Sequence, residues 1–191
     1  MIGILLAAGF SRRFGLADKL LQRLPDGQII AIVSAKNLIN AVPSSFAVVR
    51  PENKKLSRLL KNTGLEVIFC HENDQEMADS LVTAIQASGN SIAANDGFII
   101  ALADMPYIQA ATISAVAAKV IAGASIVIPT YQNQRGHPIG FAAKFRNDLE
   151  SVQGDEGARS IIKRYPNEVA LLACDDAGIL QDIDTAADLK N

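Results

Sequence analysis

The sequence has few cysteines, no long apolar segment and no surplus of basic residues, and each absence excludes a class of protein. Cys70 and Cys174 are too few and too far apart for a disulfide framework, so we expect reduced thiols in a cytoplasmic protein. No apolar segment reaches the roughly 18 to 20 residues that are needed to cross a bilayer, so we expect no membrane partner. The formal net charge of −2 argues against a nucleic-acid partner, because binding to phosphate backbones needs a surplus of Lys and Arg.

Linkers, internal repeats and low-complexity tracts are also absent. A chain of 191 residues is long enough for one well-filled domain, and no shift in composition divides it. We therefore expect a single domain over residues 1–191.

Predicted strands and helices alternate along the chain. Apolar or β-branched runs predict strands over residues 2–8, 46–49, 65–69, 97–102, 125–128 and 169–173. Apolar residues at helical spacing predict helices over 29–42, 53–62, 77–87, 112–122, 142–149 and from about 154 to 165. Residues 131–135 are predicted to form a polar loop, and a short helix capped by Thr185 or Asp184 is expected at the end. The alternation is typical of a three-layer α/β/α, Rossmann-like fold with a mostly parallel central sheet, in which ligands bind beyond the carboxyl ends of the strands.

The first strand runs into a basic loop that contains two glycines. The apolar run ends at Gly9, and Arg12, Arg13, Gly15 and Lys19 follow. Glycine lets the backbone approach a ligand closely, so that several N–H groups can point at one set of phosphate oxygens. Neither the Walker A spacing nor GxGxxG is present, which leaves a nicotinamide-dependent oxidoreductase with little support. An ordinary basic surface loop is the alternative interpretation.

A longer pattern covers the same stretch. LxAAGxSxRxGxxxK is formed by Leu5, Ala7, Ala8, Gly9, Ser11, Arg13, Gly15 and Lys19. This pattern resembles the nucleotide-binding loop of the molybdenum-cofactor nucleotidyltransferase-like family, within the wider NTP-transferase superfamily. The resemblance implies a nucleotidyltransferase domain whose nucleotide-binding residues are Leu6, Ala7, Ala8, Gly9, Ser11, Arg13, Lys19, Asn73 and Ser80. It implies catalytic roles for Arg13, Lys19 and Asp104.

Three aspartates are candidate metal ligands. Asp104 directly follows the strand predicted over 97–102, so its carboxylate lies at the edge where the basic loop emerges. A hard cation such as Mg²⁺ takes one or two carboxylates, with waters and substrate phosphates completing its shell. The alternative role for Asp104 is to cap the helix that follows Pro106. Near the end of the chain, Asp182 and Asp184 alternate around Ile183, so both carboxylates point one way in an extended segment.

The family resemblance extends to these aspartates and to the last third of the chain. It implies that a late acidic residue joins Asp104 on Mg²⁺, with Asp184 as first choice and Asp182 as the alternate. The segments at Gly136-His137-Pro138 and at Gly154-Asp155 resemble the RGHP and GDxGAR segments of the molybdopterin cytidylyltransferase branch. There they belong to the half of the cleft that receives the second substrate, which implies acceptor binding by His137 and Arg159. One departure is Glu76, where the family commonly has glycine.

The resemblance implies transfer of a nucleoside monophosphate to a phosphate-bearing acceptor, with pyrophosphate leaving. Its Ala-Ala-Gly loop, completed by Ala8, goes with CTP and molybdopterin in the family, whereas Ala-Gly-Gly goes with guanosine. A molybdenum hydroxylase is then an expected partner. The alternatives are a sugar phosphate or another small phosphate ester as acceptor, and a binding protein that carries a finished cofactor without catalysing.

Overall fold

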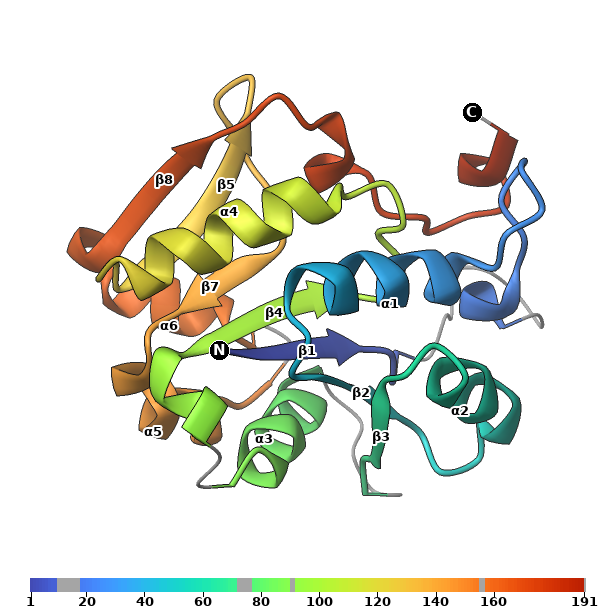
Figure 1. Ribbon diagram of the computed structural model, residues 1–191, viewed down its shortest axis with the longest axis horizontal. Coiled ribbons are helices and arrows are strands. Elements are labelled where there is room, and N and C mark those ends of the chain that lie inside the picture. Colours follow the sequence, from blue (N-terminus) through green and yellow to red (C-terminus); the bar gives the residue numbers. More distant parts are fainter. Residues whose placement is uncertain (10–17, 72–76, 90–91, 155–156, 191) are drawn as a thin grey trace.

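The computed structural model describes residues 1–9, 18–71, 77–89, 92–154 and 157–190. In these parts of the chain, helices cover both faces of an eight-stranded sheet (Figure 1). The strands are β1 (Ile2–Leu6), β2 (Ser45–Val49), β3 (Glu66–Phe69), β4 (Phe98–Leu102), β5 (Ile126–Tyr131), β6 (Gln134–Arg135), β7 (Ile139–Phe141) and β8 (Val169–Ala173). The α-helices are α1 (Ile30–Ala41), α2 (Lys54–Lys61), α3 (Met77–Ala87), α4 (Ala110–Ile121), α5 (Arg146–Glu150) and α6 (Arg159–Arg164).

One half of the sheet is parallel, as the alternation of elements predicts. β1 pairs in parallel with β2 and β4, and β2 pairs in parallel with β3. Leu6 at the end of β1 is the register partner of Leu102 at the end of β4. The two strands therefore end at the same edge of the sheet, which brings Gly9 and Asp104 to one side of the molecule.

The other half of the sheet is mixed. The strand order is β3-β2-β1-β4-β7-β5-β6, with β7 antiparallel to both β4 and β5, while β8 pairs in parallel with β5. β6 pairs with β5 through a two-residue turn at Gln132 and Asn133, both with positive φ (48° and 65°). The prediction of a polar loop over residues 131–135 is therefore wrong, because Tyr131 belongs to β5 and Gln134 and Arg135 form β6. The sequence contains no hairpin signal here, because such a turn usually contains glycine and this one does not.

Alternate residues of the central strands point to opposite faces of the sheet. Leu5 packs with α1, α2 and α4, whereas its neighbour Ile4 packs with α3, α5 and α6. β4 does the same, with Ile99 on the first face and Ile100 on the second. Strands that are buried on both faces read as continuous apolar runs, which is why the parallel half is readily predicted.

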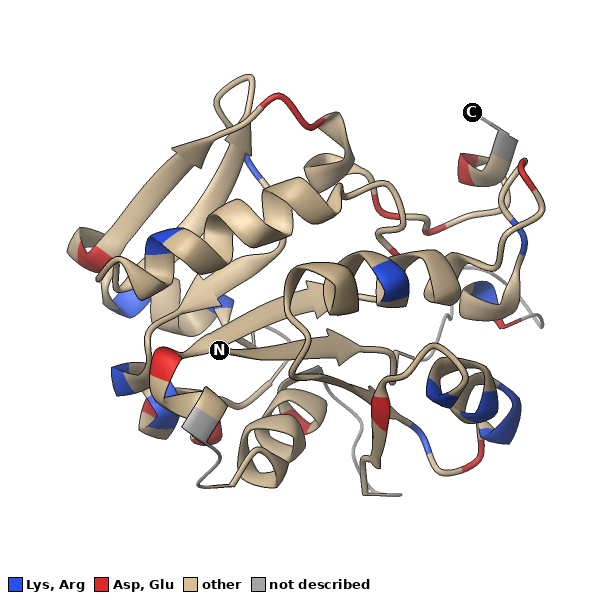
Figure 2. Cartoon of the chain, in the orientation of Figure 1, with Lys and Arg blue, Asp and Glu red and all other residues tan. Residues whose placement is uncertain are grey.

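Several helix ends follow the sequence prediction and others differ. The outer face of α2 is basic, as expected (Figure 2). The helix expected from residue 154 is shorter, because α6 begins at Arg159. At the end of the chain Asp188 starts a 3₁₀ turn, and its carboxylate accepts hydrogen bonds from Asp184 N and Thr185 N. The predicted cap by Thr185 or Asp184 is therefore wrong, because Asp188 is the residue that accepts.

Among the described helices, none is both long and apolar enough to cross a membrane.

Candidate active site

Lys19 brings together two aspartates from distant parts of the chain. Its Nζ donates to Asp104 Oδ2 at 2.8 Å and to Asp184 Oδ1 at 3.0 Å. The lysine side chain is only 10% exposed, whereas those of Asp104 and Asp184 are 23% and 33% exposed. We call these three residues the aspartate–lysine cluster. The cluster places a loop residue, a strand-end carboxylate and a late acidic residue at one rim, as the candidate site requires.

The two carboxylates hold the lysine in its charged form. Burial alone would lower the pKa of Lys19, but its hydrogen bonds and charge interactions with Asp104 and Asp184 outweigh this effect and raise that pKa above its ordinary value. Lys19 is therefore an ammonium at every pH at which the protein would normally be studied. Its positive charge offsets the repulsion between the Asp104 and Asp184 carboxylates, which both lie within hydrogen-bond distance of it.

Backbone hydrogen bonds fix Asp104 next to the late acidic segment. Asp104 O accepts from Ile183 N at 2.9 Å, and Ala103 N donates to Leu6 O at 3.1 Å. Ser34 of α1 adds a buried hydrogen bond from its hydroxyl to Ala103 O at 2.9 Å. The main chain on each side of the Asp104 carboxylate is thus attached to β1, to α1 and to the C-terminal segment.

Asp188 fixes the backbone at Asp184. Its Oδ2 accepts from Asp184 N at 3.0 Å, from Thr185 N at 2.7 Å and from Thr185 Oγ1 at 2.9 Å. These hydrogen bonds to Thr185, with that to Asp184, lower the pKa of Asp188. Ile183 between the two candidate aspartates is buried, as the alternation predicts.

The donor set fits a hard divalent cation. In the described parts of the chain, no group of three or more Asp, Glu, His or Cys side chains is close enough to hold a metal by itself. Asp104 and Asp184 form a two-carboxylate set instead, and the ammonium of Lys19 is already placed between them. Mg²⁺ usually takes one or two carboxylates and fills its shell with waters and substrate phosphates.

The structure describes part of the predicted nucleotide-binding set. Ala7 and Ala8 are buried directly after β1, Leu6 is half-buried and Gly9 is exposed, and, apart from its chain neighbours, no described residue lies within 4 Å of the place where a Cβ of Gly9 would be. Ser80 is buried near the start of α3. Ser11, Arg13, Asn73 and Glu76 lie outside the described residues, as does Asp155.

Sequence reasoning overlooked two residues that support this loop. Arg50, at the end of β2, donates from Nε to Ala8 O at 2.8 Å. Asp18 accepts from Leu20 N at 3.0 Å and from the amide of Asn53, so it ties the turn that carries Lys19 to the start of α2. Arg50 could have been found from the sequence, because it directly follows a strand predicted to be parallel. The carboxyl ends of parallel strands lie at one edge of the sheet, where the candidate site is expected.

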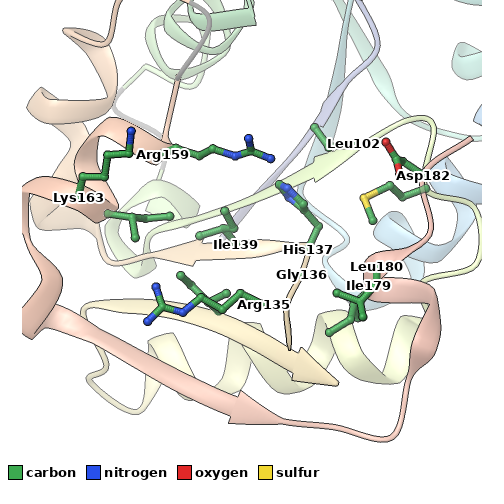
Figure 3. Close-up of a pocket in the computed structure, with 13 residues that line it drawn as sticks. Leu102, Arg135, Gly136, His137, Ile139, Arg159, Lys163, Ile179, Leu180 and Asp182 are labelled. Carbon is green, nitrogen blue, oxygen red and sulfur yellow. The ribbon is translucent and has the colours of Figure 1, made fainter. Parts of the chain in front are cut away.

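A pocket of about 410 Å³ lies beside the cluster (Figure 3). Four charged residues from three segments line it: Arg135 of β6, Arg159 and Lys163 of α6, and Asp182. Its other walls are mostly apolar and include Leu102, Met105, Ile128, Ile139, Ile162, Ile179 and Leu180. We call it the His137 pocket, because Figure 3 shows the ring of His137 between Arg159 and Asp182. Its volume suits a small organic ligand, and its charge balance suits an anionic one.

His137 is neutral at physiological pH. Burial and, to a smaller extent, the nearby Arg159 charge together lower the pKa of His137 to about 4, although the Asp182 carboxylate acts in the opposite direction. Its Nδ1 is buried and has no hydrogen-bond partner among the described residues. The backbone beneath is fixed by a hydrogen bond from His137 N to Ile179 O at 3.0 Å. Neighbouring Gly136 lies so close that a Cβ there would be 2.3 Å from the same carbonyl.

Two chain segments join the pocket to the cluster. Leu102 and Met105 line the pocket on either side of Asp104, and Asp182 lines it two residues before Asp184. The structure therefore separates the two candidate late aspartates: Asp184 contacts Lys19, and Asp182 faces the pocket. The alternative role of Asp104 as a helix cap is not seen, because Gln109 stands at the start of α4.

A half-parallel sheet of this order with helices on both faces is the Rossmann-like fold of the nucleotidyltransferases. The chain belongs to the MobA-like NTP transferase domain family, whose model matches residues 3–169. It is 30% identical to purine catabolism protein PucB of Bacillus subtilis (strain 168) over 97% of this chain and 92% of that one. It is 24% identical to nicotine blue oxidoreductase of Paenarthrobacter nicotinovorans over 96% of this chain and 91% of that one.

Solved structures show the same fold at lower identity. Rv0371c of Mycobacterium tuberculosis H37Rv superposes with a TM-score of 0.81 at 22% identity, covering 99% of this chain and 94% of that one. A structure of the same protein in complex with manganese has a TM-score of 0.80 at 21% identity, with 99% and 95% coverage. The family and fold expected from the loop pattern are therefore confirmed, and the family makes a nucleoside triphosphate the expected substrate.

Proposed function

We propose that this protein transfers CMP from CTP to the phosphate of an organic acceptor, molybdopterin in the first instance, and releases pyrophosphate. The observation that carries the proposal is the position of the aspartate–lysine cluster beside a cationic, apolar-walled pocket. One region has the groups that a metal-bound triphosphate needs, and the other has the groups that an organic phosphate needs. Two adjoining sites suit a reaction between two anionic substrates.

The chemistry needs electrostatic compensation rather than a protein nucleophile. An oxygen of the acceptor phosphate forms a bond to the α-phosphorus of CTP. The bond between that phosphorus and the oxygen that bridges it to the β-phosphorus breaks, and pyrophosphate leaves with the electron pair. Backbone N–H groups near Gly9 and the ammonium of Lys19 would stabilise the charge on the phosphate oxygens. Arg13 has the same role in the proposal, although it lies outside the described residues.

Asp104 and Asp184 are the residues that would hold a divalent cation, Mg²⁺ in this proposal. Such an ion supplies charge neutralisation to the triphosphate and to the leaving pyrophosphate. The manganese complex of Rv0371c supports the use of a divalent cation in this fold. Asp182 is kept as the alternate ligand, although its position on the pocket favours a contact with the acceptor.

The His137 pocket is the proposed acceptor site. Arg159 would bind an anionic group of the acceptor, and neutral His137 would exchange a hydrogen bond with a polar edge rather than supply charge or remove a proton. A sugar phosphate or another small phosphate ester is the alternative acceptor, and its phosphate would use the same Arg159 contact.

The choice of CTP rests on the Ala-Ala-Gly loop alone, and a cytoplasmic location with a molybdenum hydroxylase as recipient belongs to the same proposal. The test is pyrophosphate release from CTP or GTP with Mg²⁺ and molybdopterin, with Asp104→Asn as the inactive comparison. CTP-dependent release is expected. GTP use without CTP use would overturn the choice of base. Tight cofactor binding without pyrophosphate release would instead support a non-catalytic carrier.

A further inference from the structure

The ammonium of Lys19 occupies the place where a cation shared by Asp104 and Asp184 would lie. Its distances of 2.8 Å and 3.0 Å are those of two charge-assisted hydrogen bonds made by one group. A divalent cation that bound both carboxylates would have to share them with a positive charge already in contact with them. The two cations would repel each other at this range.

The backbone that carries the two carboxylates is held by hydrogen bonds that do not involve Lys19. Asp104 is attached through its carbonyl to Ile183 N, and the backbone at Asp184 is attached to Asp188. The backbone at Lys19 is also fixed, because the turn that begins there is capped by Asp18. The flexible stem of the lysine side chain is therefore the part that can change position.

We propose that the ammonium of Lys19 occupies the divalent-cation site and excludes the free cation. The site then binds this cation only together with a nucleoside triphosphate. The phosphates offer Lys19 a new anionic partner as the cation takes over its contacts with Asp104 and Asp184. The inference rests on the proposed function, and it adds that the metal–nucleotide complex is the species bound and that Lys19 exchanges partners.

Manganese binding without turnover tests the exchange. Mn²⁺ binding to the purified protein, followed by electron paramagnetic resonance, is compared in the wild type, in Lys19→Met and in Lys36→Met. Lys36 is exposed on α1 and serves as the matched control. Without nucleotide, Lys19→Met is expected to bind Mn²⁺ at least about tenfold more tightly than the wild type or the control, a coupling of ordinary size between two ligands. Equal or weaker binding by Lys19→Met, with its fold intact by circular dichroism, would overturn the proposal.

The double variant Lys19→Met with Asp104→Asn shows whether the gained binding uses the cluster. Loss of the gain is expected, whereas its persistence would place the Mn²⁺ elsewhere and contradict the proposal.

The wild-type protein provides a second test that depends on no variant folding. The side-chain ammonium of ¹⁵N-labelled Lys19 is followed by NMR during additions of Mg²⁺, CTP and both. Mg²⁺ alone should leave the signal nearly unchanged, and Mg²⁺ with CTP should shift it. A full shift with Mg²⁺ alone would refute the exclusion of the free ion. Absence of pyrophosphate release would leave both binding results standing and would count against nucleotidyl transfer alone.

Discussion

The aspartate–lysine cluster and the His137 pocket adjoin each other, but their charges have opposite sign: carboxylates are in excess in the cluster, and cationic side chains are in excess in the pocket. In the cluster, one buried ammonium is paired with two carboxylates, and each contributing segment is held by backbone hydrogen bonds. In the pocket, cationic side chains surround an apolar floor, and within the described parts of the chain the Arg135 and Arg159 side chains form no ion pair. A region in which carboxylates outnumber the ammonium is suited to exchanging one cation for another. A region with surplus positive charge is suited to gaining an anion.

The strongest test of this contrast is removal of charge from the cluster. Asp104→Asn is expected to lower kcat by roughly 10²–10³, by analogy with the loss of one electrostatic group from a water-poor site. Pyrophosphate release at saturating acceptor measures this effect. The control is Asp175→Asn, which changes an exposed aspartate away from the cluster. Unchanged kcat in Asp104→Asn would contradict the role given to the cluster.

Substitutions of the two late aspartates should change different kinetic quantities. Asp184→Asn is expected to weaken Mg²⁺ dependence and lower kcat by roughly tenfold or more, since it removes one of two carboxylates from the cluster. Asp182→Asn is expected to change acceptor KM and to leave Mg²⁺ dependence as it is, because Asp182 faces the pocket. Activity titrated with Mg²⁺ separates the two variants, and the reverse result would make Asp182 the ligand.

Variants of the pocket should act on the acceptor alone. Arg159→Gln is expected to raise acceptor KM by about tenfold, the usual cost of losing a hydrogen bond to a charged group, with little change in kcat or in CTP KM. Steady-state kinetics with each substrate varied in turn measures the split. Lys144→Gln is a suitable comparison, because Lys144 pairs with Glu168 on the surface. A kcat effect as large as that of Asp104→Asn would remove the distinction between the two regions.

The pH dependence of stability should come from the pocket rather than from the cluster. Because the pKa of His137 is about 4 in the fold and about 6.5 when unfolded, the unfolded chain binds the proton more readily between these values. The free energy of unfolding should therefore fall as pH drops from 6.5 towards 4 and be unaffected by this group above 6.5. The raised pKa of Lys19 acts only above about 10.5, where deprotonation removes its contribution.

Urea denaturation between pH 7.5 and 4.5 measures this dependence. His137→Gln should lack part of the acid-side loss, whereas His71→Gln, the variant of the other histidine in the chain, should keep it. The same slope in all three proteins would contradict a depressed pKa at His137.

The smallest effect is expected at a support of the cluster. Ser34→Ala removes the hydroxyl that donates to Ala103 O next to Asp104 and should lower the free energy of unfolding by about 1 kcal/mol. Because β1 and the C-terminal segment still hold this loop, kcat should fall by less than in Asp104→Asn. Denaturation and kinetics on the same preparation measure both quantities. A kcat loss without a stability loss would mean that Ser34 acts on the substrate directly.

The sequence was sufficient to predict the parallel half of the fold and the position of the cluster. Continuous apolar strands that end at Gly9 and before Asp104 must place those residues at one edge, and the loop pattern added the family. The pocket could not be predicted in this way. Its walls come from the two-residue strand β6, the three-residue strand β7, helix α6 and the segment around Ile179, and strands this short show no periodicity from which their long-range contacts could be inferred.

The hydrogen bond between Lys19 and Asp184 joins residues that are 165 positions apart. The segment that contains Asp184 must therefore be synthesised before this contact can form, and loop closure over such a separation belongs to the late stages of folding. Until then Lys19 has only Asp104 as its partner within the cluster. In the proposed site, a metal–nucleotide complex could therefore bind between Asp104 and Asp184 only after the segment around Asp184 has docked.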